Sequence, residues 1–286
     1  MADSVSKKSD YSIGVVTFLD RYEETFKKLA IDLARYFPDV EKNVILNGFP
    51  DKNRQLKYLK EATGFLSGLG FNHVLTFETH QSLARGWNLL VILSSKSKVL
   101  ILNDDCLMGP GFRKEFETQK GNRDWIFINE SYSHFMTSKN VVRKVGWFDE
   151  RFKGIGHEDG DFSRRCALAG YPYDVGIDCP TLKNLKVESR EVSYLETDNN
   201  NKKGFLGKVR NYLNREKSGR SGNYSTYNEY FFRKKWKHAD RPLPGYTLIP
   251  IRHLKKYRGI KPGAGAYCKL APGMETPLFY PLDILN

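Results

Sequence analysis

The chain has 286 residues, 40% of them hydrophobic and 28% charged, and its 46 Lys and Arg against 33 Asp and Glu give a formal net charge of +13. This composition is typical of a globular protein with one large domain, or with a domain and an appendage. No apolar run reaches the roughly 18 residues of a membrane-spanning helix, and the polar N-terminal residues lack the apolar core of a signal peptide. We therefore expect a cytoplasmic protein, either free or peripheral at a membrane.

Short apolar segments alternate with helical patterns along the first hundred residues. Strands are expected at residues 11–18, 43–46, 73–77 and 98–102, and helices at about 23–37, 55–66 and 82–93. This alternation through short connections favours right-handed βαβ units and a parallel sheet with helices on both faces. The sequence therefore predicts an α/β fold, in which ligands bind beyond the carboxyl ends of the strands.

The segment after the first strand argues against two common nucleotide-binding classes. It reads TFLDRYEE, which contains neither GxGxxG nor GxxxxGK[ST]. A Rossmann dehydrogenase and a P-loop nucleotide hydrolase are therefore disfavoured. The four cysteines, Cys106, Cys166, Cys179 and Cys268, form no CxxC pair, so we expect free thiols in place of a zinc site or a disulfide framework.

Two adjacent carboxylates follow the fourth expected strand, in the stretch VLILNDDCLMGPGF. Asp104 and Asp105 would project into the cleft at the end of the sheet. Paired carboxylates there can hold a hard divalent cation, Mg²⁺ or Mn²⁺, whose remaining ligands come from water and substrate phosphates. The alternative is a solvated turn or a helix cap.

A second acidic cluster lies in GIGHEDGDFSRR, residues 154–165, where three carboxylates fall within four positions after two glycines. A helix is expected to begin there, and Asp at a helix start is an ordinary cap worth about 1 kcal/mol. We favour this structural role for Asp161 and a chemical role for Asp159. The positive end of the helix dipole is expected to favour the ionised form of Asp159.

Positive charge is concentrated after residue 200, and residues 197–227 are polar and rich in Asn, Ser and Gly, as in a loop or linker. Such a basic zone can attract nucleic acid, an anionic membrane or a phosphorylated ligand, or be solvated surface. The segment FFRKKWK interleaves aromatic and basic residues, which suggests peripheral contact with anionic lipid.

Four segments in order resemble the GT-A-fold inverting glycosyltransferases of the family 2-like type, which includes galactosyl- and N-acetylhexosaminyltransferases. They are VVTFLDRYEETFKKL, VLILNDDCLMGPGF, VGWFDERFKGIGHEDGDFSRRCALAGY and NEYFFRKKW, and the resemblance covers roughly residues 12–237. The third is the most specific. The resemblance implies a mixed, mainly parallel GT-A (Rossmann-like) sheet with helices on both faces and a basic C-terminal extension.

The resemblance also implies a domain organisation. Residues 1–10 would be a flexible N-terminus and 11–195 the catalytic domain, with a nucleotide-sugar half at about 11–105 and an acceptor half at about 106–195. Residues 196–286 would be a basic loop and an extension packed on the catalytic domain.

For the nucleotide sugar, the resemblance implies a DxD-like motif in which Asn103 replaces the first Asp. Asp105 would hold Mn²⁺ or Mg²⁺, Asp104 would lie near the ribose or assist the metal, and His238 or His253 would join the metal shell. The other implied donor contacts are Thr17, Phe18, Arg21, Asn47, Arg85 and Asn88. For the last two, a surface pair on an amphipathic helix is the alternative.

For the reaction, the resemblance implies that Asp159 is the general base and that Glu158 orients the acceptor. Trp147, Gly156 and His157 would contact the acceptor, with core packing as the alternative for Trp147. The expected activity is inverting transfer of a hexose or N-acetylhexosamine from a nucleotide sugar, with UDP as the default, to a saccharide or lipid-linked saccharide. The alternatives are a nucleic-acid-binding protein, which no binding motif supports, and an inactive GT-A scaffold or sugar-binding module.

Overall fold

A computed structural model describes most of the first two thirds of the chain. The described residues are 9–48, 51–129, 131–171 and 176–185, followed by 228, 231–232, 235–236 and 280–285. The basic zone after residue 200 therefore lies largely outside them, and so do His238, His253 and Cys268. Among the described residues no helix is both long and apolar enough to cross a membrane.

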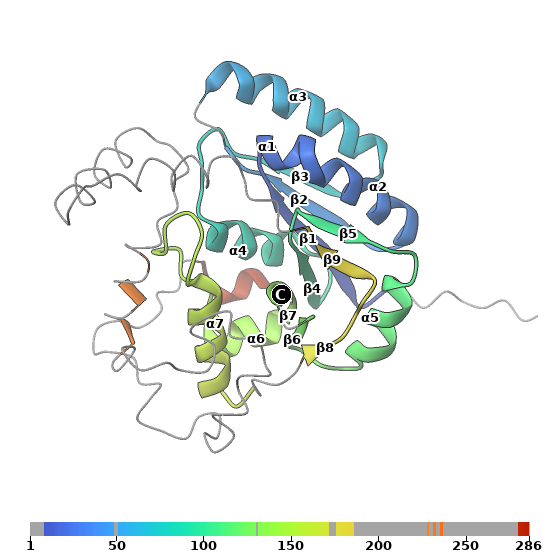
Figure 1. The fold of residues 1–286 in the computed structure, drawn as a ribbon. Coiled ribbons are helices and arrows are strands. Elements are labelled where there is room, and N and C mark those ends of the chain that lie inside the picture. The colour runs from blue at the N-terminus through green and yellow to red at the C-terminus, as the bar shows by residue number, and fades with distance from the viewer. Residues whose placement is uncertain are drawn as a thin grey trace, which may run out of the picture.

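The described residues form a central seven-stranded sheet (Figure 1). Its strands, in spatial order, are β3 (His73–Thr76), β2 (Lys42–Leu46), β1 (Tyr11–Thr17), β4 (Lys98–Leu102), β7 (Ser131–Ser138), β6 (Ile126–Ile128) and β8 (Gly176–Ile177). Only β7 runs antiparallel to its neighbours. A separate ribbon pairs β5 (Cys106–Met108) with β9 (Leu182–Asn184). The predicted mixed, mainly parallel sheet is confirmed.

Helices cover both faces of this sheet (Figure 1), as predicted. One face packs against α2 (Lys27–Tyr36), α3 (Lys52–Gly68) and α5 (Phe112–Lys120), and the other against α4 (Leu83–Leu93), α6 (Lys139–Val145) and α7 (Glu158–Leu168). The short α1 (Leu19–Arg21) and a π-helical turn, η1 (Tyr22–Phe26), precede α2, and η3 (Leu282–Leu285) packs beside α6.

Local sequence explains several of these elements. All five residues of β2 and of β4 are buried, as expected for strands covered on both faces. Asp51, Ser82 and Ser138 accept backbone N–H bonds at the starts of α3, α4 and α6, so each is an N-cap. Gly86 brings α4 close to β1, because a Cβ there would lie 2.7 Å from a methyl group of Val16.

The expected elements differ from the observed ones in several places. The helix expected at 23–37 begins at Leu19 and includes the π turn, and the helix expected at 55–66 covers Lys52–Gly68. Residues 133–137 were not expected to form a strand, yet they lie in β7. The helix α5 was also not expected, because its polar sequence, FRKEFETQK, buries only Phe112 and Phe116.

The order of the strands creates a switch point between β1 and β4. From β1 the chain moves outward through β2 and β3, and it then crosses the sheet through α4 to β4, on the other side of β1. The register pairs Val15 with Leu102, so the residues just after the two strands are neighbours. In open α/β sheets, ligands bind at such a point beyond the carboxyl ends of the strands.

Candidate active site

A buried acidic pair lies at the switch point. Asp104 and Asp105 follow β4 and are 5% and 3% exposed. Arg21, in the helical turn after β1, places Nη1 2.5 Å from Asp105 Oδ2 and 3.7 Å from Asp104 Oδ1. Asn103 donates its amide N–H to Asp105 Oδ1 at 2.6 Å. The segments expected to hold the nucleotide and the metal therefore meet through an ion pair.

The charge state of this pair reflects its burial. Burial raises the pKa of Asp104 to about 7, with Arg21 opposing the rise and the charge of Asp105 adding to it. The buried Asp104 Oδ2 makes no hydrogen bond to any residue that the structure describes. A buried, unsatisfied carboxylate oxygen is costly unless a ligand or water completes its shell.

The oxygen ligands at this pair fit a divalent cation of the Mg²⁺ or Mn²⁺ kind, which uses one or two protein carboxylates and completes its shell with water and phosphate. Asp104 Oδ2 is available, whereas both oxygens of Asp105 are occupied by Asn103 and Arg21. No group of three or more His, Cys, Asp or Glu side chains in the described part of the chain is arranged to hold a metal. A bound cation would therefore have to compete with Arg21 for Asp105.

The second acidic pair begins α7. Glu158 is 2% exposed and accepts the Gly156 N–H at 2.6 Å, while Asp159 is partly exposed and accepts the Gly160 N–H at 2.7 Å. The loop before them needs left-handed backbone, with φ of 58° at Gly154, 117° at Gly156 and 73° at His157. Glycine adopts these angles without strain, which explains the two glycines in the motif.

The pKa values of this pair correct one expectation. The helix start was expected to favour the ionised form of Asp159, but burial raises the pKa of Asp159 and also that of Glu158, to which the charge of Asp159 adds. Desolvation therefore outweighs the helix dipole. Because Glu158 is the more buried of the two, we assign the retained proton to Glu158 and the charge to Asp159.

Both acidic pairs lie at the same edge of the sheet. The N-terminus of α4 is at the carboxyl edge because α4 follows β3 directly. The Leu83 N–H, in the first turn of α4, donates to the Gly154 carbonyl oxygen at 2.9 Å. This bond ties the loop before Glu158 to the edge at which Asp104 and Asp105 lie.

The other expected donor contacts differ in their surroundings. Thr17 is buried, Phe18 is half-buried and Arg85 is exposed, with its guanidinium over the Phe77 ring. The amides of Asn47 and Asn88 are already used within the protein. Asn47 bonds to the backbone of Gly48 and Gln81, and Asn88 to the backbone of Phe148 and to Glu150. These two side chains fix loops at the sheet edge.

Of the expected acceptor contacts, Gly156 and His157 are partly exposed beside Glu158. Trp147 is fully buried, and its Nε1–H donates to the Tyr280 carbonyl oxygen at 2.7 Å. The ring therefore belongs to the core, which corresponds to the alternative considered for it. Phe148 is also core, stacked on Phe162 with ring centroids 3.9 Å apart.

Sequence reasoning missed an ionic cluster next to α7. Lys235 Nζ lies 2.6 Å from both Asp149 Oδ2 and Asp161 Oδ1, and none of the three side chains is exposed. Arg165 also pairs with Asp161, at 3.0 Å. Because Phe232, Lys235 and Trp236 are buried, those three residues of FFRKKWK are not available to a lipid surface. The NEYFFRKKW resemblance was the only sequence indication of this cluster.

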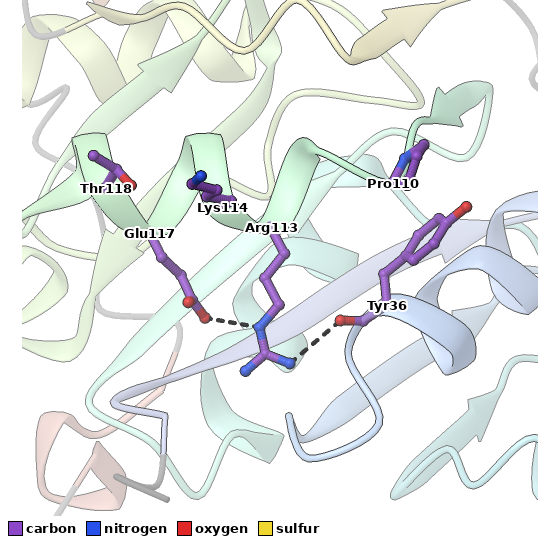
Figure 2. A pocket seen from close by; sticks show the side chains of 6 residues that line it. All are labelled: Tyr36, Pro110, Arg113, Lys114, Glu117 and Thr118. Carbon is purple, nitrogen blue, oxygen red and sulfur yellow. Dashed lines mark hydrogen bonds and ion pairs between the residues drawn. The ribbon is translucent and has the colours of Figure 1, made fainter.

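A cavity of about 490 Å³ lies elsewhere, between α5 and the C-terminal end of α2 (Figure 2). Its lining residues are Tyr36, Pro110, Arg113, Lys114, Glu117 and Thr118. Arg113 donates to Glu117 and to the Tyr36 carbonyl oxygen (Figure 2), so its charge is already satisfied within the protein. None of the predicted site residues lines this cavity.

No protein-family model matches the sequence, and no curated protein matches it. Solved structures do match. TarS of S. aureus aligns at a TM-score of 0.45 with 14% identity over 59% of this chain and 34% of its own. The mannosyltransferase PcManGT from Pyrobaculum calidifontis, in complex with GDP-Man and Mn²⁺, aligns at 0.45 with 12% identity over 60% and 57%.

Glucosyl-3-phosphoglycerate synthase from Mycobacterium tuberculosis, in complex with Mn²⁺, UDP and phosphoglyceric acid, aligns at a TM-score of 0.45 with 11% identity over 60% of this chain and 70% of that chain. The alignment covers 34% of the length of TarS and 57% of the length of PcManGT, so this chain spans only part of either protein. With TM-scores below 0.5, these similarities establish no activity for this chain.

Proposed function

We propose that the protein is a glycosyltransferase that moves a hexose or N-acetylhexosamine from a nucleoside diphosphate sugar, with UDP as the expected nucleotide, to a saccharide or lipid-linked saccharide. The observation that carries the proposal is the presence of two acidic pairs at one edge of an α/β sheet, Asp104–Asp105 at the switch point and Glu158–Asp159 at the start of α7. The motif resemblance supplies the reaction class.

The residues divide the reaction between them. Asp159 accepts the proton of the acceptor hydroxyl as that oxygen bonds to the anomeric carbon, and the nucleoside diphosphate leaves from the opposite side with inversion. Glu158, held by the Gly156 N–H, orients the acceptor. Arg21 supplies a positive charge at the switch point, where the diphosphate would lie. A divalent cation held by Asp104 and Asp105 would offset the charge of the leaving group.

The proposal is tested by incubating the full chain with a panel of UDP- and GDP-sugars, with Mn²⁺ or EDTA, and measuring nucleotide release and thermal stabilisation. Asp159→Asn should still be stabilised by the active donor but lose transfer by about 10²–10⁴-fold. Asp105→Ala should lose the Mn²⁺-dependent part of the stabilisation.

Asp178→Asn removes an exposed carboxylate outside both pairs and is the matched control. Full transfer by the Asp159 variant would reject the assigned base. Failure of every nucleotide sugar to bind the wild-type protein would reject the proposed function.

A further inference from the structure

One buried amide side chain holds the loop that leads into Glu158. Asn228 is fully buried; its Oδ1 accepts the Lys153 N–H at 2.9 Å, and its Nδ2 donates to the carbonyl oxygens of Lys153 and Gly156, each at 2.8 Å. This loop contains the three left-handed residues described above, which a regular helix or strand cannot accommodate. Its conformation therefore depends on bonds from outside the loop.

One buried ammonium joins the two ends of the same segment. Asp149 lies in the turn before the loop and Asp161 in the first turn of α7, and Lys235 Nζ contacts both at 2.6 Å. The neighbouring Trp236 donates its Nε1–H to Asp161 Oδ1 at 2.8 Å. With no side-chain exposure, this ion pair is not screened by solvent, and its geometry is strongly restricted.

Both contacts act on residues 149–161, and Asp159 lies inside that segment. We propose that Asn228 and Lys235 are positioning residues: they fix the segment 149–161 and thereby aim the Asp159 carboxylate into the site. The catalytic part of this inference rests on the proposed function, whereas the positioning of the segment does not. The two residues lie more than 65 positions beyond Asp159 in the sequence.

The variants Asn228→Ala and Lys235→Met test the positioning by amide hydrogen–deuterium exchange in the full chain. After Lys235→Met each carboxylate keeps an arginine partner, Arg151 for Asp149 and Arg165 for Asp161, so no buried charge is left alone. We expect exchange within residues 149–161 to rise about tenfold or more while exchange in β1 and β4 changes much less.

Two control variants remove the same kinds of contact elsewhere. Asn129→Ala deletes an amide that clamps the backbone of Cys179 and Leu182, and Lys98→Met deletes the ion pair with Asp10. Neither should raise exchange at 149–161 above the change in β1. The positioning role is overturned if exchange at 149–161 does not change in the test variants. It is also overturned if that exchange rises only as much as exchange in β1.

Kinetics then test the catalytic part. With an active nucleotide sugar, both test variants should lower kcat about tenfold or more and leave KM for the donor within about twofold, because the acidic pair at the switch point is untouched. Raised exchange with unchanged kcat would overturn the role in catalysis. If the wild-type protein transfers no sugar, the proposed function fails, while the exchange result still decides the positioning.

Discussion

Replacing Arg21 with Gln should lower the free energy of unfolding, because Arg21 neutralises the acidic pair at the switch point. The side chains of Arg21, Asp104 and Asp105 are 16%, 7% and 4% exposed, so Arg21→Gln leaves two nearly buried carboxylates without their cation. Breaking a buried pair by removing one partner costs about 3–5 kcal/mol. Because Arg21 keeps some exposure and Asp104 can take up a proton, we expect the lower end, about 3 kcal/mol.

For a domain of this size, about 3 kcal/mol corresponds to a fall in Tm of roughly 6–12 °C. Differential scanning fluorimetry in EDTA and in Mn²⁺ measures the effect. Without Arg21 as a competitor, Mn²⁺ should bind Asp105 more readily, and at 100 times its Kd it would restore about 2.7 kcal/mol. The Mn²⁺-induced rise in Tm should therefore be larger in the variant than in the wild-type protein.

Arg113→Gln is the matched control, because Arg113 pairs with Asp39 and Glu117 at the surface, where such pairs contribute about 0–1 kcal/mol. If Arg21→Gln were as stable as the wild-type protein in EDTA, the stabilising role of the buried ion pair would be refuted. Equal Mn²⁺ responses of the two proteins would refute competition between Arg21 and the cation.

Four further substitutions test other parts of the structure. Glu158→Gln should reduce the pH dependence of stability: a carboxyl with a pKa raised from 4.5 to about 8 binds a proton in the folded state that the unfolded state releases, so wild-type stability falls between those pH values. The difference in free energy of unfolding between variant and wild type, measured by urea denaturation, should change by at most about 1.4 kcal/mol per pH unit, and a constant difference would contradict the raised pKa. Phe162→Ala removes a buried ring that stacks on Phe148 and should cost about 3–5 kcal/mol by the same assay, with a loss below about 1 kcal/mol arguing against this packing. Gly48→Ala should destabilise the protein, because a Cβ there would lie 2.1 Å from the Thr79 carbonyl carbon, whereas Gly64→Ala, in the open middle of α3, should stabilise it by about 0.5–1 kcal/mol. Equal Tm values for these two glycine variants would contradict the close contact at Gly48.

The sequence predicted the parallel part of the sheet well because its strands contain short runs of apolar residues, such as 44–46 in β2 and 99–102 in β4, separated by amphipathic helices. The sequence also singled out the two acidic pairs as candidate site residues, because carboxylates that follow such a strand or a pair of glycines interrupt the surrounding pattern. It failed at β7, where His134 and Ser138 interrupt the apolar pattern although both are buried. A residue pattern does not show that a polar side chain will be satisfied inside the core.

The sequence alone could not predict roles that depend on contacts between residues far apart in the chain. From the sequence, the amide of Asn88 could contact a ligand or another part of the protein. Its hydrogen bonds to Phe148 and Glu150, some 60 residues away, decide for the protein contact. Trp147 could likewise be a ligand contact or a core residue, and its edge-to-face contact and hydrogen bond with Tyr280 show that it belongs to the core. The Lys235 cluster depends on contacts between segments 74 and 86 residues apart, which no local pattern encodes.

The sequence separation between Asn228 and the loop before Glu158 has a consequence for folding during synthesis. The seven strands of the sheet that the structure describes all lie before residue 178, so a growing chain can assemble this sheet before Asn228 and Lys235 have been synthesised. Contacts over such separations also form late in folding, because the intervening chain must first lose its freedom. A ribosome-bound or truncated chain that ends before residue 228 would carry both acidic pairs without the contacts from Asn228 and Lys235, and we expect the proposed transfer activity to arise only when the last third of the protein has been synthesised.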